Sequence, residues 1–284
     1  MTGRLLLRVG ISPSWLLLAP TLIALTVFFI YPLCGILLKS FIDPVFTWKH
    51  YARFVHDPVY LRVLLQTFTI AGWVTVATIL LGYPLAYFLS RLKPGTAALL
   101  MIVVVVPYFT SILVRTYAWM VLLGTEGIFN QLLIRAGLMV RPLQLMYTRT
   151  SVLIGMTYIL LPYMILALYS VMRGIDTNLL SAAESLGASR IRAFWRVFVP
   201  LSRPGLGAGA LLVFILSLGF FITPALMGSE QDSMISMLIE NQVENYFDSG
   251  FASALSSILL VCTLLLFAIY GRMIGLQNLF EAKL

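Results

Sequence analysis

Charge and cysteine are both scarce in this sequence. Charged residues make up 11% of the 284 residues and hydrophobic residues 60%, a composition that excludes a soluble globular domain. Cys34 and Cys262 each lie inside a long apolar run, so they are interpreted as small buried apolar residues rather than as a disulfide pair. The sequence therefore predicts a chain that lies mostly within a membrane.

Several catalytic and energy-coupling signals are also missing. No aspartate or glutamate falls inside the long apolar runs, which argues against the buried carboxylate relay of a proton- or sodium-driven transporter. None of the four lysines follows a glycine, so the sequence lacks the Gly-Lys-Ser/Thr core of a phosphate-binding loop. His50 and His56 have no cysteine partners and no metal-site spacing. We therefore predict no catalytic residue, no metal ligand and no cofactor bound by this chain.

Six apolar runs are long enough to be membrane spans. A hydrocarbon core of about 30 Å needs about 20 helical residues. The first run is too long for the apolar region of a cleaved signal peptide, and no small-residue cleavage site follows it. The sequence thus predicts an all-α polytopic membrane protein with residues 1–284 in a single transmembrane domain. The predicted spans are 15–38, 64–89, 97–123, 151–172, 205–227 and 253–275.

Basic residues are distributed unevenly between the segments that connect these spans. If the N-terminus is inside, the inner segments hold eleven basic and three acidic residues, and the outer segments hold seven basic and eight acidic residues. Because basic residues are retained on the cytoplasmic side, this pattern predicts that both termini are cytoplasmic. The same excess of basic residues on the inner side explains the net charge of +8, so the charge does not require a nucleic-acid partner.

The predicted cytoplasmic loop 173–204 has the pattern of two short helices joined at a glycine. Asp176 is a typical N-cap residue, and Gly187 is predicted to end the first helix with a positive φ angle. The second helix is predicted to begin at Ser189 and to be stopped by Pro200 and Pro204. Such a corner would present a docking surface to another protein.

A basic amphipathic helix that merely lies in the lipid headgroups is the alternative for this loop. Arg190, Arg192 and Arg196, with Trp195 beside them, are typical of such helices. An interfacial helix does not require the glycine corner, however, so protein docking is favoured.

The same loop resembles the EAA loop of binding-protein-dependent ABC importer permeases. That pattern reads Glu-Ala-Ala, three residues, Gly, nine residues, Ile, any residue, Leu-Pro. Ser181 stands where the pattern has glutamate, and Glu184 is the carboxylate that could replace it. The resemblance implies a type I ABC importer permease fold and a contact with an ATPase subunit. The residues that it assigns to this coupling contact are Ser181, Ala182, Ala183, Glu184, Gly187 and Pro200.

Three further stretches, 107–119, 127–130 and 159–163, resemble permeases of spermidine/putrescine-type importers. The resemblance covers roughly residues 15–275 and implies import of a polyamine into a bacterium by alternating access. It also implies an inner-membrane location, a second homologous permease, a periplasmic solute-binding protein and an ATP-binding subunit dimer that holds ATP and Mg. Import of another small polar solute is the alternative, and an ATP-independent transporter or channel is a more distant one.

Arg115 is the one charged residue deep within a predicted span. It either extends to the outer interface or faces the pathway. For a polyamine, we expect Arg115 to point away from the pathway, and aromatic faces to stabilise the cation. The outer segment 230–248 carries five carboxylates, which would attract a cation, dock a binding protein or simply reflect the exclusion of basic residues. The candidate pathway residues are Tyr108, Arg115, Tyr117, Trp119, Tyr158 and Tyr163.

Overall fold

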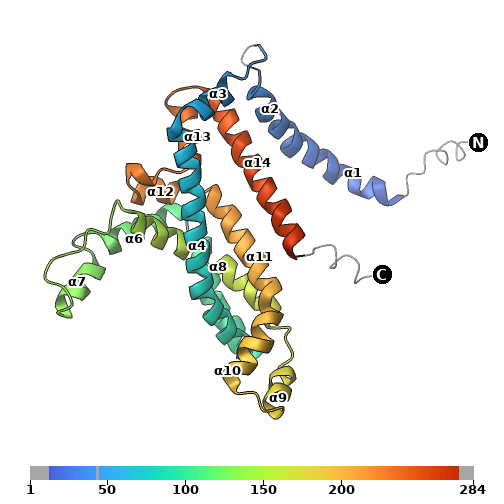
Figure 1. Ribbon diagram of the computed structural model, residues 1–284, viewed down its shortest axis with the longest axis vertical. Helices are drawn as coiled ribbons and strands as arrows, with labels where there is room; N and C mark the ends of the chain where they lie inside the picture. Colours follow the sequence, from blue (N-terminus) through green and yellow to red (C-terminus); the bar gives the residue numbers. More distant parts are fainter. Residues whose placement is uncertain (1–12, 43–44, 275–284) are drawn as a thin grey trace, which may run out of the picture.

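A computed structural model describes residues 13–42 and 45–274, and these residues form helices without a β-strand (Figure 1). Arg4, Arg8 and Lys283, which contribute to the predicted orientation, lie outside the described residues. The helices are α1 (Pro13–Leu25), α2 (Tyr31–Lys39), α3 (Lys49–His56), α4 (Pro58–Arg91), α5 (Pro94–Val105), α6 (Ile112–Leu123), α7 (Ile128–Arg135), α8 (Arg149–Met172), α9 (Asn178–Ser185), α10 (Arg190–Ala193), α11 (Val199–Leu218), α12 (Ile222–Met227), α13 (Ile235–Glu244) and α14 (Ser249–Ile274).

The expected number of six spans is confirmed for the described part of the chain. Six helical segments are long and apolar enough to cross a membrane, and a shorter apolar helix covers Pro94–Phe109. The six segments are Leu18–Lys39, Pro58–Arg91, Ile112–Arg135, Arg149–Met172, Arg190–Leu218 and Ser249–Arg272.

The core of the bundle is the packing of α4, α8 and α11. Two glycines of α11 allow its backbone to lie close to α8. A Cβ added at Gly205 would lie 2.9 Å from the Cβ of Val171, and one added at Gly209 would lie 2.8 Å from the Sδ of Met164. Small residues four apart are the usual means of close helix packing in membranes. The sequence analysis did not single out this pair, although its Gly-x-x-x-Gly spacing is visible in the sequence.

The prediction of one helix over 97–123 is wrong. Helix α5 ends at Val105, a short 3₁₀ turn follows at Val106–Phe109, and α6 begins at Ile112. Pro107 has no N–H to donate and its ring crowds the preceding turn, so the regular helix is interrupted there. Thr110 is extended, with φ −83° and ψ 151°, and it separates the two helices.

The predicted helix end at Pro200 is also wrong, as is a continuous helix over 205–227. The helix that begins at Arg190 runs through a π-helical turn at Phe194–Phe198 directly into α11. The Val199 N–H donates to the Phe194 carbonyl five residues earlier, so the helix is widened just before Pro200, which has no N–H to donate. Helix α11 then ends at Leu218, and α12 is a separate short helix.

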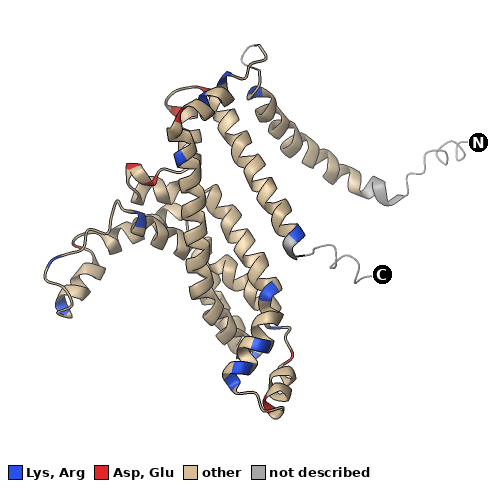
Figure 2. Ribbon diagram, in the orientation of Figure 1, with Lys and Arg blue, Asp and Glu red and all other residues tan. Residues whose placement is uncertain are grey.

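The two short helices expected outside the spans are present. Helix α7 is followed by Gly137 with φ +70°, and α13 covers most of the predicted 234–243 segment. We call the end of the bundle that carries α9 and α10 the α9 end, and the opposite end the α13 end (Figure 1). Blue basic residues gather on α10 and its neighbours at the α9 end, whereas the α13 end carries both signs of charge (Figure 2).

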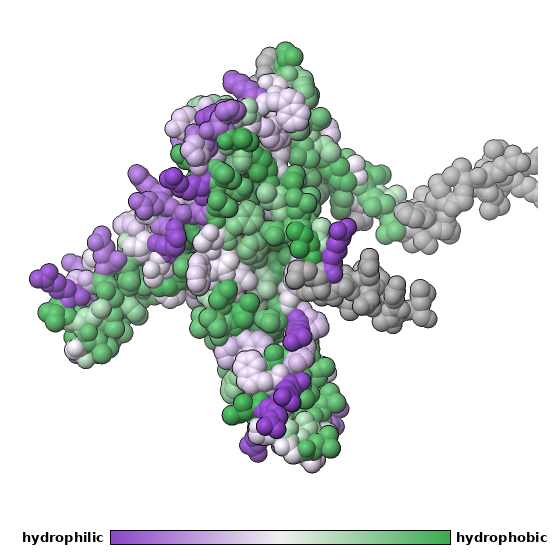
Figure 3. Space-filling model, in the orientation of Figure 1, coloured by the Kyte–Doolittle hydropathy of each residue, from purple (hydrophilic) through white to green (hydrophobic). Residues whose placement is uncertain are grey.

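The first apolar segment, Leu18–Lys39, is the least closely packed of the six. Its helix α2 contacts α14 near the α13 end, and α1 extends away from the bundle (Figure 1). Phe28 and Tyr31 expose 82% and 77% of their surface. This segment therefore presents its apolar side chains to lipid or to another subunit. On the face that Figure 3 shows, the surface over α4 and α14 between the two ends is also mainly hydrophobic.

Candidate functional site

The corner between α9 and α10 has the geometry that the glycine pattern predicts. Gly187 has φ +90°, which confirms the expected positive φ angle. The Ala188 N–H donates to the Ala183 carbonyl at 3.0 Å, and the Gly187 N–H donates to the Glu184 carbonyl at 2.9 Å. These two bonds form the helix-ending arrangement that favours glycine. At the other end of α9, the Asp176 carboxylate accepts a hydrogen bond of 2.9 Å from the Asn178 N–H.

The corner exposes apolar side chains at the α9 end. Leu186 is 90% exposed, and Ile191 and Trp195 are also exposed. A groove of about 310 Å³ runs between the two helices. Exposed apolar groups beside a groove are typical of a protein-docking surface. The groove is lined by Ala183, Leu186, Gly187, Ala188, Arg192, Ala193, Arg196 and Val197.

The remaining coupling candidates, Ser181, Ala182, Glu184 and Pro200, are not among the residues that line this groove. Ser181 and Ala182 are exposed on α9, and Pro200 lies in the first turn of α11. Glu184 is 3.9 Å from the Arg190 guanidinium, so its carboxylate lies across the corner within this chain. An ion pair this exposed contributes little to stability.

Aromatic packing joins the corner to the bundle. Phe198 is buried, and the Arg91 guanidinium carbon lies 4.9 Å from the centre of its ring. Tyr83 of α4 and Ser202 of α11 share a hydrogen bond of 2.8 Å. Arg173, just after α8, donates to the Leu92 carbonyl at 2.7 Å. These contacts connect the α9 end of the bundle to α4, α8 and α11.

A second candidate site is a cavity of about 540 Å³ between the 106–115 region, α8 and the end of α11. Tyr163 donates a hydrogen bond of 2.5 Å to the Tyr108 hydroxyl, and the two rings meet edge to face. The Arg115 guanidinium carbon lies 5.7 Å from the centre of the Tyr108 ring. The lining residues are Tyr108, Ile112, Arg115, Ile159, Leu160, Tyr163, Ile215, Leu216, Gly219 and Phe220.

Arg115 thus lines a cavity together with Tyr108 and Tyr163, whereas for a polyamine substrate we expected it to point away from the pathway. Its side chain is half-buried, and its Nε atom is buried without a hydrogen-bond partner. No carboxylate lines the cavity.

The other aromatic candidates lie elsewhere. Trp119 and Tyr158 meet edge to face at 5.4 Å and line a separate, almost wholly apolar cavity of about 380 Å³. Tyr117 is exposed and lines neither cavity. The structure therefore brings together three of the six candidates, Tyr108, Arg115 and Tyr163. Proximity in sequence could not separate the two sets, because Arg115 and Trp119 lie on the same helix α6, and Tyr158 and Tyr163 both lie on α8.

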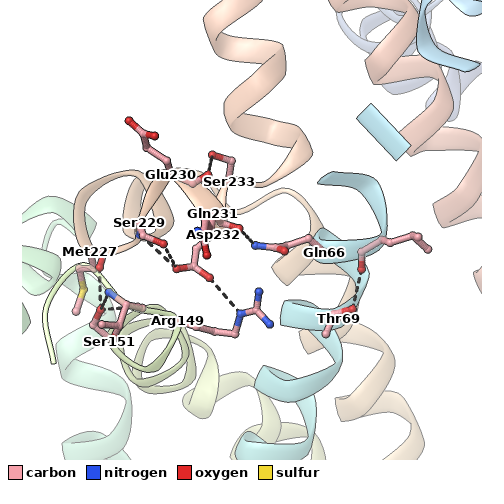
Figure 4. A network of polar contacts seen from close by, with 12 residues as sticks. Gln66, Thr69, Arg149, Ser151, Met227, Ser229, Glu230, Gln231, Asp232 and Ser233 are labelled. Atoms are coloured by element: carbon pink, nitrogen blue, oxygen red, sulfur yellow. Dashed lines mark hydrogen bonds and ion pairs between the residues drawn. The ribbon is translucent and has the colours of Figure 1, made fainter. Parts of the chain in front are cut away.

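A network of polar contacts at the α13 end connects the segment between α12 and α13 to α8 (Figure 4). The buried Asp232 carboxylate accepts a hydrogen bond of 3.1 Å from Arg149 Nε and one of 2.5 Å from the Ser229 hydroxyl. The Ser151 hydroxyl donates to the Met227 carbonyl at 2.7 Å, and the Gln66 side chain of α4 donates to a backbone carbonyl of the same loop.

The acidic outer segment is therefore not a cluster of five free carboxylates. Asp232 is buried against Arg149, and Asp248 pairs with Arg53 at 3.1 Å. Two of the five carboxylates hold this end of the bundle together, which leaves Glu230, Glu240 and Glu244 for an external charge. The Arg149–Asp232 pair was not predicted, because its residues are 83 positions apart in the chain.

Asp232→Asn should lower the stability of the folded permease by about 1–3 kcal/mol, since it weakens charge-assisted hydrogen bonds at a buried position. The measurement is the thermal midpoint of the purified complex in detergent. Asp248→Asn is the matched control, because the pair that it weakens is more exposed and should contribute less than about 1 kcal/mol. Equal shifts in the two variants would show that the burial of Asp232 has no special role.

In the described residues no three His, Cys, Asp or Glu side chains are grouped so that they could hold a metal ion. What the geometry offers is a docking corner, a cavity between helices and a closed loop at the opposite end.

The fold is that of an ABC transporter permease. A chain of a bacterial alginate ABC transporter, crystallised with an alginate pentasaccharide-bound periplasmic protein, matches with a TM-score of 0.75. That match covers 92% of this chain and 93% of the other, at 19% sequence identity.

The chain belongs to the family of binding-protein-dependent transport system inner membrane components, which matches residues 76–276. It is 39% identical to the spermidine/putrescine transport system permease protein PotB of Salmonella typhimurium, over 84% of this chain and 83% of that protein. PotB of Haemophilus influenzae is 36% identical, over 96% of this chain and 94% of the relative. The protein is thus a multi-pass inner-membrane permease subunit of an ABC importer, a family with ATPase and binding-protein partners.

Proposed function

We propose that this permease imports a polyamine of the spermidine or putrescine type by alternating access. The observation that supports this most strongly is 36–39% identity to spermidine/putrescine permeases over most of the chain. Tyr108 and Tyr163 offer aromatic faces and a hydroxyl acceptor to an ammonium group in the cavity.

The energy comes from a partner ATPase dimer that binds ATP and Mg, and this chain itself catalyses no reaction. The corner around Gly187 docks in a groove of that ATPase, with Ser181, Ala182, Ala183 and Glu184 at the contact and Pro200 at the start of the lever that it moves. A second, homologous permease completes the pathway, since the cavity that contains Arg115 is open in the single chain. A periplasmic binding protein delivers the solute to the α13 end.

This function is tested by reconstituting the full importer, with its binding protein, in liposomes. Labelled spermidine or putrescine should accumulate only when ATP is inside and the binding protein is outside. Accumulation without ATP would instead indicate a secondary transporter or a channel.

A zwitterionic or anionic solute is the second candidate, because a guanidinium and no carboxylate faces the cavity. The two candidates are separated by adding unlabelled amino acids, phosphonates or polyamines to the uptake assay. Competition by polyamines alone supports the first, and competition by solutes with an anionic group supports the second.

The α9 end is expected to face the cytoplasm, and both termini are expected to lie on the same side of the membrane. Seven basic residues and two acidic ones, counted from the segments at that end, give the expected positive-inside bias. Reporter fusions after Arg192 should give a cytoplasmic signal, and fusions after Glu240 a periplasmic one. A periplasmic signal at Arg192 would contradict the orientation and the ATPase contact together.

A further inference from the structure

The cavity between the 106–115 region, α8 and α11 already contains a cation, which is the Arg115 side chain. Its guanidinium carbon lies 5.7 Å from the centre of the Tyr108 ring, within the distance of a cation–π contact. We propose that Arg115 occupies the substrate's ammonium site when the cavity is empty, and that a substrate ammonium displaces it. This inference rests on the proposed polyamine function.

The tyrosine pair has the chemistry of an ammonium site. Tyr163 uses its hydroxyl proton to donate to Tyr108, so the Tyr163 oxygen can still accept a hydrogen bond. The Tyr108 ring supplies a negative face, which Arg115 now covers. An oxygen acceptor beside an aromatic face suits a primary ammonium as well as it suits a guanidinium.

The charge inside the cavity explains why the two cations exclude each other. None of the ten described lining residues is acidic, so no carboxylate of the lining neutralises Arg115 there. A substrate ammonium that entered beside it would meet a like charge at close range. Binding of the substrate ammonium therefore requires displacement of the Arg115 side chain.

The position of Arg115 is poorly anchored, which makes its displacement easy. Its Nε atom is buried with no hydrogen-bond partner, an unfavourable state for a charged group. The side chain is half-buried, and it is carried by the first turn of α6, just after the break at Pro107. Movement toward the open side of the cavity would restore the missing hydrogen bond to water. An Nε atom without a hydrogen-bond partner is thus what we expect of an Arg115 side chain that the substrate displaces.

The size of the cavity suits this exchange. About 540 Å³ lies within the range of small-molecule sites, and it exceeds the space that one ammonium group needs. Apolar residues, among them Ile159, Leu216 and Phe220, form the rest of the wall. They fit the methylene chain of a diamine whose terminal ammonium lies at the tyrosine pair.

The test is equilibrium binding of labelled putrescine to the assembled permease–ATPase complex in lipid nanodiscs, without the binding protein. Arg115→Gln should tighten putrescine binding at least about tenfold, because it removes the competing charge. Arg115→Lys keeps the charge and should stay within about threefold of the wild type, the scatter expected of a substitution that retains the charge. Arg135→Gln, at an exposed position on α7, is the matched control and should change nothing.

Tyr163→Phe tests the location, because it removes the acceptor and keeps the ring. It should weaken putrescine binding in both the wild-type and the Arg115→Gln backgrounds. Unchanged or weaker binding in Arg115→Gln, in a complex that still assembles with its ATPase, overturns the inference. The inference is also overturned if Arg115→Gln tightens putrescine binding and adding Tyr163→Phe does not weaken it.

Uptake by the wild-type importer separates this inference from the proposed function. If the wild type imports polyamine but Arg115→Gln binds putrescine no more tightly, only the displacement mechanism fails. If the wild type neither imports polyamine nor binds putrescine, the polyamine function fails and this inference fails with it.

Discussion

Gly187→Val is expected to reduce transport by at least about tenfold while the chain still inserts and assembles. The reason is the backbone, since a Cβ at this position meets no atom within 4 Å but φ is +90°. A β-branched side chain is strongly disfavoured at positive φ, so the helix-ending bonds of α9 would be lost and the docking corner would change direction. The measurement is binding-protein-dependent uptake, with the amount of co-purified ATPase measured in parallel.

Two variants separate a coupling defect from a general folding defect. Gly187→Asn should retain most of the activity, because asparagine tolerates positive φ. Gly137→Val imposes a similar penalty at φ +70° at the end of α7, away from the ATPase contact, and should leave coupling intact. Normal uptake in Gly187→Val would remove this corner from the mechanism.

Gly205→Leu is expected to prevent recovery of a stable permease. Even a Cβ here would lie 2.9 Å from Val171 and 3.1 Å from the Ala167 carbonyl, so a larger side chain must separate α11 from α8. Overpacking of this kind costs about 1–3 kcal/mol or more, and the loss extends along the interface that forms the core. The measurement is the yield of monodisperse protein and its thermal midpoint in detergent.

Gly72→Leu is the matched control, because Gly72 lies within helix α4 and a Cβ there meets nothing within 4 Å. It should insert, purify and melt like the wild type. If both variants behave alike, close contact at Gly205 is not what limits packing.

The sequence predicted those features that depend on local spacing. Six apolar runs, the helix-ending Gly187 and the short outer helices α7 and α13 could all be read from periodicity and from residues that favour particular backbone angles. The effect of proline could not be predicted in the same way. Pro107 breaks its helix, whereas Pro200 is accommodated by a π-helical turn, and the difference depends on neighbouring packing.

The candidate site was predicted in part, for a related reason. Tyr108 and Tyr163 share a cavity although 55 residues separate them, whereas Tyr108 and Trp119 are close in sequence and lie in different places. Which aromatic residues meet is decided by the direction of α6 after the break at Pro107 and by its packing against α8 and α12. One chain without its homologues carries no signal for such distant contacts, and the Arg149–Asp232 pair was missed for the same reason.

The helix that runs unbroken from Arg190 to Leu218 has a mechanical consequence. At 1.5 Å per residue, its 29 residues form a rod about 44 Å long. One end of the rod is the docking corner, and the other leads directly into Gly219 and Phe220 in the cavity wall. A tilt of about 5° at the corner would move the far end of such a rod by about 4 Å, roughly the width of a methylene chain. If the proposed ATPase contact rotates this rod, we expect the small rotation at the corner to change the width of the cavity.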